Sequence, residues 1–198
     1  EQYEEIIFET ANSFAFVDPT LASDHSANRK DMQYYNEAIY CYYLEDYEGA
    51  MRAAKQALKL GSIKASYLLI ELYYDEDSPY RDVEKTISYA KQLFEATKDP
   101  ELAFLLGIVY DQQLKDYVKA VNWYENAERL GHKRVAFYLG RIYYYGLLRT
   151  KRDGGKALSY FKKARENGIQ EAEGYIKDLE DLKGEDLQTA VEKWERAV

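Results

Sequence analysis

Small and apolar residues recur along the chain with helical spacing, and one spacing is written several times. Pairs of alanines lie seven residues apart, and a further small or aromatic residue stands four positions after the first alanine. Positions i, i+4 and i+7 share one stripe of an α-helix, so each pattern predicts a helix packed closely against a neighbour. The four clear copies are Ala50–Ala54–Ala57, Ala120–Tyr124–Ala127, Ala157–Phe161–Ala164 and Ala190–Trp194–Ala197.

A fifth, weaker copy makes the spacing regular along the chain. Thr86, Ala90 and Leu93 occupy the same slots, and the first members of the five copies are then separated by 36, 34, 37 and 33 residues. Self-similarity at such a period predicts a stack of similar structural units. It does not favour the alternative, one catalytic site and a second stretch that merely resembles it. A glycine follows three of the copies by four residues, where a helix can end in the left-handed conformation: Gly61, Gly131 and Gly168.

The helix that precedes each of these stripes carries a second repeated phrase. Residues 103–110 read AFLLGIVY and residues 136–143 read AFYLGRIY. Gly107 and Gly140 are expected to leave a gap in the helix surface where the backbone of a neighbouring helix can approach. No alternating strand pattern is present, so the sequence predicts an all-α chain of helix hairpins.

One hairpin cannot bury its apolar faces alone, so the units are expected to stack. The units are predicted at about 31–60, 62–97, 100–131, 133–168 and 170–198. Residues 1–30 are expected to form an N-terminal helix (2–16) and a linker that caps the first unit. The apolar face of that helix would consist of Ile6, Ile7, Phe8, Ala11, Phe14 and Ala15.

The pattern resembles the tetratricopeptide superfamily and, in its later units, the Sel-one-like branch. One unit matches at Ala136, Gly140, Tyr143, Gly146, Lys156-Ala157, Phe161, Lys163-Ala164 and Gly168, and another at Ala103, Gly107, Tyr110, Asp116, Lys119-Ala120, Trp123, Ala127 and Gly131. The resemblance implies a right-handed α-solenoid of about five antiparallel helix hairpins with an extra N-terminal helix. Ile70 and Leu93 depart from the pattern, so the second unit is expected to pack more loosely or at another angle.

The resemblance also implies that the first helix of each unit lines a concave, partner-binding wall. Tyr42, Tyr74 and Tyr144 share one repeat column and are the strongest candidates for partner contact. Tyrosine is a favoured anchor at interfaces, although many of these rings could instead fill gaps between helices. The full predicted wall is Tyr35, Tyr42, Tyr43, Tyr67, Tyr74, Phe104, Ile108, Asp111, Phe137, Arg141, Tyr144 and Tyr145.

Charge is distributed unevenly over the 198 residues, which include 35 acidic and 27 basic residues. Residues 1–100 carry 19 acids and 10 bases, whereas residues 129–165 carry 11 bases and Asp153 as the single acid. The second stretch predicts a basic patch that could attract an acidic protein, anionic lipid or nucleic acid. Nucleic acid is disfavoured because the acidic remainder would repel a polyanion. The patch is assigned to Arg134, Arg149, Lys151, Arg152, Lys162 and Lys163.

Catalytic and metal-binding residue sets are not recognisable in the sequence. His25 and His132 are the two histidines, and both are interpreted as exposed loop residues. Gly154-Gly155 reads as a helix start rather than a phosphate loop, and residues 75–77 read as a solvated acidic turn. Cys41 is the one cysteine, which excludes an intramolecular disulfide and a thiolate zinc cage. No cofactor and no metal are therefore expected.

These observations predict a non-enzymatic interaction module, an adaptor or scaffold that binds a partner protein or peptide. Three alternatives stay open: an immunity-type inhibitor of a toxin or enzyme, a weak hydrolase, and a protein that assembles by end-to-end stacking. The sequence contains no run of 18 apolar residues, so it does not predict a membrane-spanning helix. The chain is expected to be soluble, and either cytoplasmic or exported after removal of a leader preceding Glu1.

Overall fold

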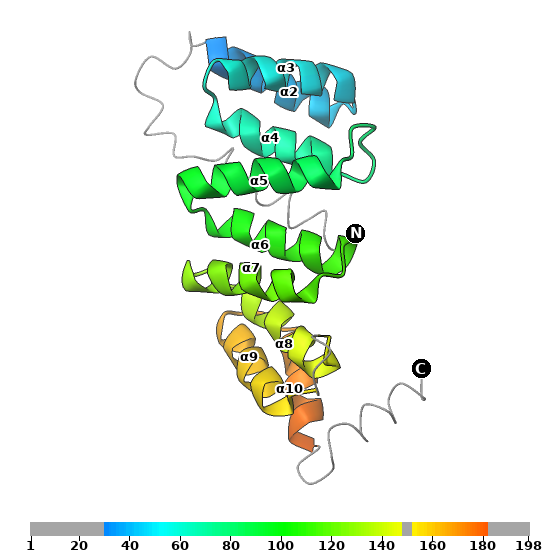
Figure 1. Ribbon diagram of the computed structural model, residues 1–198, viewed down its shortest axis with the longest axis vertical. Coiled ribbons are helices and arrows are strands. Elements are labelled where there is room, and N and C mark those ends of the chain that lie inside the picture. The colour runs from blue at the N-terminus through cyan, green and yellow to red at the C-terminus, as the bar shows by residue number, and fades with distance from the viewer. Residues whose placement is uncertain (1–29, 148–151, 182–198) are drawn as a thin grey trace. The chain divides into compact units, whose positions relative to one another are not determined.

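The structure is a computed structural model that describes residues 30–147 and 152–181 (Figure 1). These residues form helices joined by turns and loops, with no strand among them, so the predicted all-α class is confirmed. The chain divides into two compact units, with the boundary between Thr97 and Lys98. The predicted N-terminal helix at 2–16 and the Ala190–Trp194–Ala197 stripe lie outside the described residues.

Helices pack in pairs along the chain within each unit. In the first unit α2 packs on α3, α3 on α4, and α4 on α5; in the second, α6 packs on α7, α7 on α8, α8 on α9, and α9 on α10. The right-handed course and the total of about five hairpins stay predictions. The helices of the first unit are α2 (Lys30–Tyr43), α3 (Tyr47–Lys59), α4 (Ile63–Tyr74) and α5 (Val83–Thr97). Those of the second are α6 (Pro100–Ile108), the π-helix η3 (Val109–Gln113), α7 (Tyr117–Arg129), α8 (Val135–Tyr145), α9 (Gly154–Glu166) and α10 (Ala172–Asp181).

The alanine stripes lie at the helix contacts, as their spacing predicts. A small side chain lets two helix backbones approach closely, and such a position has little solvent exposure once the helices meet. The alanines at these positions are fully buried: Ala50, Ala54, Ala57, Ala120, Ala127, Ala157 and Ala164. Tyr124 and Phe161, which occupy the middle slot of two stripes, are also fully buried.

Gly107 and Gly140 admit an aromatic ring rather than a neighbouring backbone, which corrects the sequence-based expectation. A Cβ atom at Gly107 would lie 2.3 Å from Cδ1 of Tyr124, and one at Gly140 would lie 2.8 Å from Cδ1 of Phe161. In both hairpins, the first helix lacks a side chain at the point where the second helix inserts its ring. Packing at protein interiors leaves no room for both groups.

In the hairpin of α4 and α5, the large side chain stands on the first helix and the small one on the second, the reverse of the arrangement in the hairpins α6–α7 and α8–α9. Ile70 stands in the glycine column and Ala90 in the ring column, and both side chains are buried. A large residue on the first helix and a small one on the second conserve the combined volume, which is the kind of exchange that cores tolerate best. The larger residue at position 70 is therefore compensated by the smaller residue at position 90, although both depart from the repeat pattern.

An aspartate begins the second helix of each hairpin in the same way, although the preceding loops differ in length. Its carboxylate accepts a hydrogen bond from the backbone N–H three residues later, which is N-capping. Its own N–H donates to a carbonyl in or just after the last turn of the first helix, at 2.8–3.1 Å. The donor–acceptor pairs are Asp46 with Cys41, Asp82 with Tyr73, Asp116 with Tyr110, and Asp153 with Tyr143.

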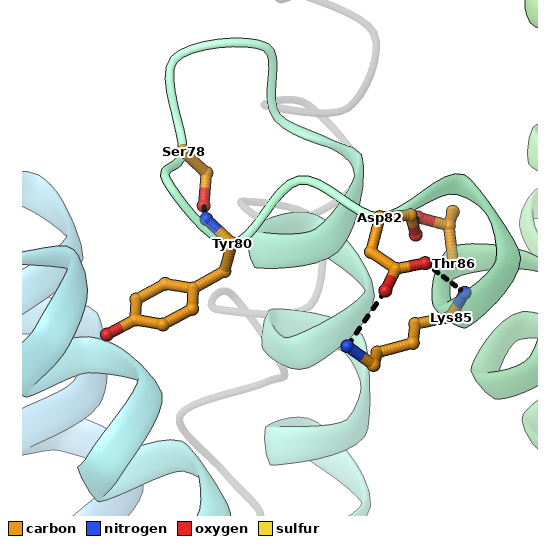
Figure 2. Close-up of polar contacts among 5 residues, drawn as sticks. All are labelled: Ser78, Tyr80, Asp82, Lys85 and Thr86. Carbon is orange, nitrogen blue, oxygen red and sulfur yellow. Dashed lines mark hydrogen bonds and ion pairs between the residues drawn. The ribbon is translucent and has the colours of Figure 1, made fainter.

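The loop between α4 and α5 shows this capping in detail. Figure 2 shows the Asp82 carboxylate between the backbone N–H and the ammonium of Lys85, with Nζ at 2.8 Å. The Lys85 ammonium also lies 5.2 Å from the centre of the Tyr73 ring. Earlier in the loop, the N–H of Tyr80 donates to Oγ of Ser78, and the Tyr80 ring packs against the core of the first unit. The long loop is thus tied to the hairpin at both ends.

Three helix ends confirm the left-handed glycines. Gly61, Gly131 and Gly168 have φ values of 89°, 90° and 88°. A glycine adopts this conformation without the steric cost that a Cβ atom would impose. The residue that follows turns inward: Ser62 and His132 are both buried. The interpretation of His132 as an exposed loop residue was therefore wrong, because the chain re-enters the core directly after the glycine.

Candidate partner-binding surface

One stripe of α8 carries large side chains that are neither buried nor fully exposed. Phe137, Arg141 and Tyr145 follow one another at intervals of four residues, so they lie along one side of the helix. All three are half-buried. The opposite side of α8 holds Leu139 and Ile142, which are almost completely buried. Core packing on one side therefore fixes the orientation of the stripe on the other.

Tyr175 on α10 lies beside this stripe, and the sequence analysis did not select it. Its ring meets Phe137 edge-on with centroids 5.8 Å apart and stacks on Phe161 at 4.5 Å. Its hydroxyl lies 3.4 Å from that of Tyr145, close enough for either to donate. The repeat register assigns it to the core instead, because Tyr175 follows Gly168 by seven residues as the buried Tyr138 follows Gly131.

Tyr144 is buried, which does not fit direct contact with a partner. Its ring meets Tyr145 at 5.0 Å and Tyr175 at 5.2 Å, both nearly perpendicular. It also contacts Phe161 edge-on at 6.1 Å. The Tyr144 ring therefore packs beneath the half-buried Tyr145 and Tyr175, and aromatic pairs of this geometry add to the stability gained from buried area.

Arg141 is placed close to an acidic side chain from the preceding hairpin. The Tyr124 hydroxyl donates to the Asp111 carboxylate at 3.1 Å. Burial raises the pKa of Asp111 above its ordinary value, while the Tyr124 hydrogen bond and the charge of Arg141 act in the opposite direction. The Asp111 carboxylate thus places a negative charge near the positive charge of Arg141 in the stripe.

Phe104, Ile108 and Tyr35 also belong to the core rather than to an accessible wall. Phe104 and Ile108 are 2% and 3% exposed. Phe104 stacks on the ring of His132 at 4.0 Å, and the His132 Nε2 lies 3.1 Å from a Glu101 carboxylate oxygen. The first position of the wall stripe therefore serves packing in α2 and α6, and remains half-exposed in α8.

The first unit has a polar cluster at the corresponding wall of α4. The Tyr42 hydroxyl, from α2, donates to the Asp75 carboxylate at 3.0 Å, and the Tyr47 ring of α3 meets Tyr42 edge-on. Burial and the charge of Asp75 raise the pKa of Glu71 to about 8, against a smaller lowering by the Tyr42 hydrogen bond. Residues 75–77 are therefore not a wholly solvated turn, because Asp75 closes α4 and is half-buried.

The remaining candidates of the first unit differ in exposure. Tyr67 and Tyr74 are half-buried, and Tyr43 is 54% exposed at the end of α2. Lys64 lies 5.8 Å from the centre of the buried Tyr35 ring. The first unit therefore presents tyrosines beside carboxylates, whereas the second presents aromatic rings beside an arginine.

The predicted basic patch is partly neutralised by acids that lie outside the basic stretch in sequence. Lys163 is 2.7 Å from Glu128 of α7, and Lys162 is 2.8 Å from Glu180 of α10. The Arg152 Nε donates to the carbonyl of Tyr145 at 3.5 Å, and Arg134 is half-buried at the start of α8. Arg149 and Lys151 lie outside the described residues. A count along the sequence therefore overstates the local positive charge.

Two further features of the part of the chain that the structure describes are the distribution of its metal-ligating side chains and the length and apolar character of its helices. No group of three or more His, Cys, Asp or Glu side chains gathers there in a metal-binding arrangement. Within residues 30–147 and 152–181, no helix has both the length and the apolar character needed to cross a bilayer.

The fold and the surface define a helical repeat protein, and comparison with known families identifies the repeat. Residues 100–132 and 134–169 each match the family model described as Sel1 repeat. The chain therefore contains two Sel1 repeats, formed by α6–α7 and α8–α9, and the resemblance seen in the sequence is confirmed there. The α8 stripe lies in the second of them.

A curated protein of Candida glabrata shares part of this sequence. It is described as "ERAD-associated E3 ubiquitin-protein ligase component HRD3" and is 31% identical to this chain over 100 residues. The matched stretch covers 48% of this chain but 12% of that protein. The similarity therefore concerns a small part of the longer protein.

Proposed function

We propose that this chain is a non-enzymatic adaptor. It would hold a partner protein or peptide on the solvent-facing side of the first helix of each hairpin. The observation that carries the proposal is the α8 stripe of Phe137, Arg141 and Tyr145, flanked by Tyr175. Three aromatic side chains and an arginine gather there without being fully buried. These residue types are enriched among the anchors of protein interfaces.

The relative's description supports this class of function. A protein described as a component of a ubiquitin-protein ligase belongs to an assembly, and 100 residues of this chain match it at 31% identity. The same segment here would serve to bind another protein.

Each side chain of the stripe has a distinct role in the proposal. Phe137, Tyr145 and Tyr175 offer flat apolar area at small cost in conformational entropy. Arg141 offers a planar set of N–H donors that suits carbonyl and carboxylate groups of a partner. Tyr144 stays beneath them and keeps Tyr145 and Tyr175 in place. We infer that Tyr42, Tyr43, Tyr67 and Tyr74 form a second contact surface on the first unit.

Site-specific photo-cross-linking in native extract tests the proposal directly. A photoreactive phenylalanine analogue at position 145 is expected to capture a defined partner that mass spectrometry can identify. The matched control places the same analogue at Asn122, which is exposed on α7. Equal capture at both positions would remove the α8 surface from consideration.

Affinity for the captured partner then tests the role of the arginine. Arg141→Ala is expected to weaken binding about tenfold or more, corresponding to about 1.4 kcal/mol. Arg129→Ala removes the same side-chain type from an exposed site on α7 and is expected to leave affinity unchanged. Helical circular dichroism of both variants should match the parent. A partner that binds Arg141→Ala at full strength does not use this surface.

A further inference from the structure

The end of α2 carries an apolar patch at a position that is core in the corresponding helices. The repeat register aligns Tyr40 with Leu72 of α4, Val109 of η3 and Ile142 of α8. Those three side chains are at most 1% exposed, whereas Tyr40 is 66% exposed. Leu44, one helical turn later, is 61% exposed, and Tyr43 between them is 54% exposed.

The preceding helix is what buries this position elsewhere. In α4, Leu72 lies in one core cluster with Ala50 and Met51 of α3. In the second unit, the preceding helix α7 likewise packs on α8. No described helix precedes α2, so Tyr40 and Leu44 occupy the corresponding place without that cover.

The rest of the outer face of α2 is polar, which limits what can cover it. Gln33, Asn36 and Glu37 stand where the other first helices place buried side chains, such as Ala65, Leu68 and Leu69 of α4. A terminal unit of a repeat array needs such a polar outer face. A complete preceding hairpin would bury these polar groups, so the occupant covers the C-terminal half of α2 alone.

The chain itself supplies a short apolar segment within reach. Ile7, Ala11 and Phe14 fall at i, i+4 and i+7 and form one stripe of the predicted N-terminal helix. The 13 residues from 17 to 29 can span about 43 Å when extended. The 14 residues of α2 extend about 21 Å, so the linker can carry the segment back along the helix.

We propose that residues 2–16 dock on the patch formed by Tyr40 and Leu44, with the Ile7–Ala11–Phe14 stripe toward α2. The segment covers Tyr40 and Leu44 at the C-terminal half of α2, where the second helix of a preceding hairpin covers the corresponding residues elsewhere. This contact is independent of the proposed partner surface on α8. Intrachain docking also leaves the patch unavailable for a second copy of the chain.

Thiol reactivity in the full chain tests the docking without any partner. A Leu44→Cys variant in a Cys41→Ala background is treated with a bulky maleimide under native conditions. Adding Ile7→Asp and Phe14→Asp is expected to raise the labelling rate at position 44 at least fivefold. The matched control is Leu130→Cys, 42% exposed after α7, whose rate should not respond to the same changes.

A disulfide measurement keeps the proposal testable if the aspartate variants fold poorly. Phe14→Cys combined with Leu44→Cys should form a cross-link within one chain on mild oxidation in dilute solution. Equal labelling at position 44 with and without the aspartates, together with no intrachain cross-link, would overturn the proposal. Protection that appears only at high protein concentration, or cross-links between chains, would assign the patch to a second copy and overturn it as well.

Discussion

Glu71 shows how a single residue makes the first unit sensitive to pH. The side chain lies on α4 beside Asp75, with the Tyr42 hydroxyl as its hydrogen-bonding neighbour. Burial and the neighbouring carboxylate raise its pKa to about 8, from an ordinary value of 4.5. Between these two values the folded chain retains a proton that the unfolded chain has released. The free energy of unfolding therefore falls as pH rises through this window.

We expect Glu71→Gln to remove this dependence. One retained proton can change the free energy of unfolding by at most about 1.4 kcal/mol per pH unit. The parent should lose stability in α4 between pH 5 and pH 8, and the glutamine variant should lose much less. Hydrogen exchange of the α4 amides, corrected at each pH for the intrinsic exchange rate, measures the difference in stability between the parent and the variant.

Glu48→Gln provides the matched control for this measurement, because Glu48 is exposed in the first turn of α3. That variant should follow the pH dependence of the parent. If the parent and Glu71→Gln show the same slope between pH 5 and pH 8, the carboxyl group of Glu71 is ionised in the folded chain and the assignment fails.

At the scale of elements, two hairpins pack by placing an aromatic ring of one helix in the space that a glycine leaves on the other. Tyr124 fills the space over Gly107, and Phe161 fills the space over Gly140. A sequence pattern can show that glycine and aromatic residues share a period, but it does not show that they meet. The alternative expectation, a close backbone, satisfied the pattern equally well. Only the arrangement of the two helices distinguishes them.

Gly107→Ala is expected to destabilise the second unit by about 1–3 kcal/mol. The new Cβ would stand 2.3 Å from a carbon of the Tyr124 ring, and that ring is fully buried and hydrogen-bonded to Asp111. This strain exceeds the gain of about 1 kcal/mol that alanine offers over glycine in a helix. Urea unfolding followed by circular dichroism gives the difference.

Gly174→Ala on α10 is the matched control, because a Cβ there would meet nothing within 4 Å. It is expected to be neutral or stabilising by up to about 1 kcal/mol. Reducing the ring with Tyr124→Leu should make Gly107→Ala less costly than it is in the parent. Additive effects of Gly107→Ala and Tyr124→Leu would contradict the steric explanation.

At the scale of the whole molecule, tertiary pairing changes the electrostatic picture. Residues 129–165 have a large formal positive charge, but α7 and α10 place Glu128 and Glu180 against Lys163 and Lys162. These pairs are at least partly exposed and contribute little to stability. They do lower the potential that an approaching polyanion would meet.

Replacing both acids should restore that potential. Glu128→Gln with Glu180→Gln is expected to raise the salt concentration at which the protein elutes from a heparin column. The control, Glu48→Gln with Glu84→Gln, changes net charge equally at exposed sites of the first unit. If the two double variants shift elution equally, net charge rather than the local patch determines retention.

The sequence by itself determined the elements and most of the core. The spacing of its alanines and glycines predicted where helices begin, end and touch, because a period of 3.6 residues assigns each position to a face. Left-handed glycines act through neighbouring residues, so a local pattern was enough to place the helix ends at Gly61, Gly131 and Gly168. The candidate wall was predicted as a set of columns, and its role in partner binding stays a prediction.

The tertiary structure decided which members of those columns face solvent. Tyr144, Phe104 and Tyr35 are buried, while Tyr175 joins the α8 stripe from a different helix. It also decided that His132 lies in the core beside Phe104 and that lysines of the basic stretch meet acids from other helices. Exposure and charge pairing depend on neighbours that are distant in sequence, and a one-dimensional period contains no information about their distance in space.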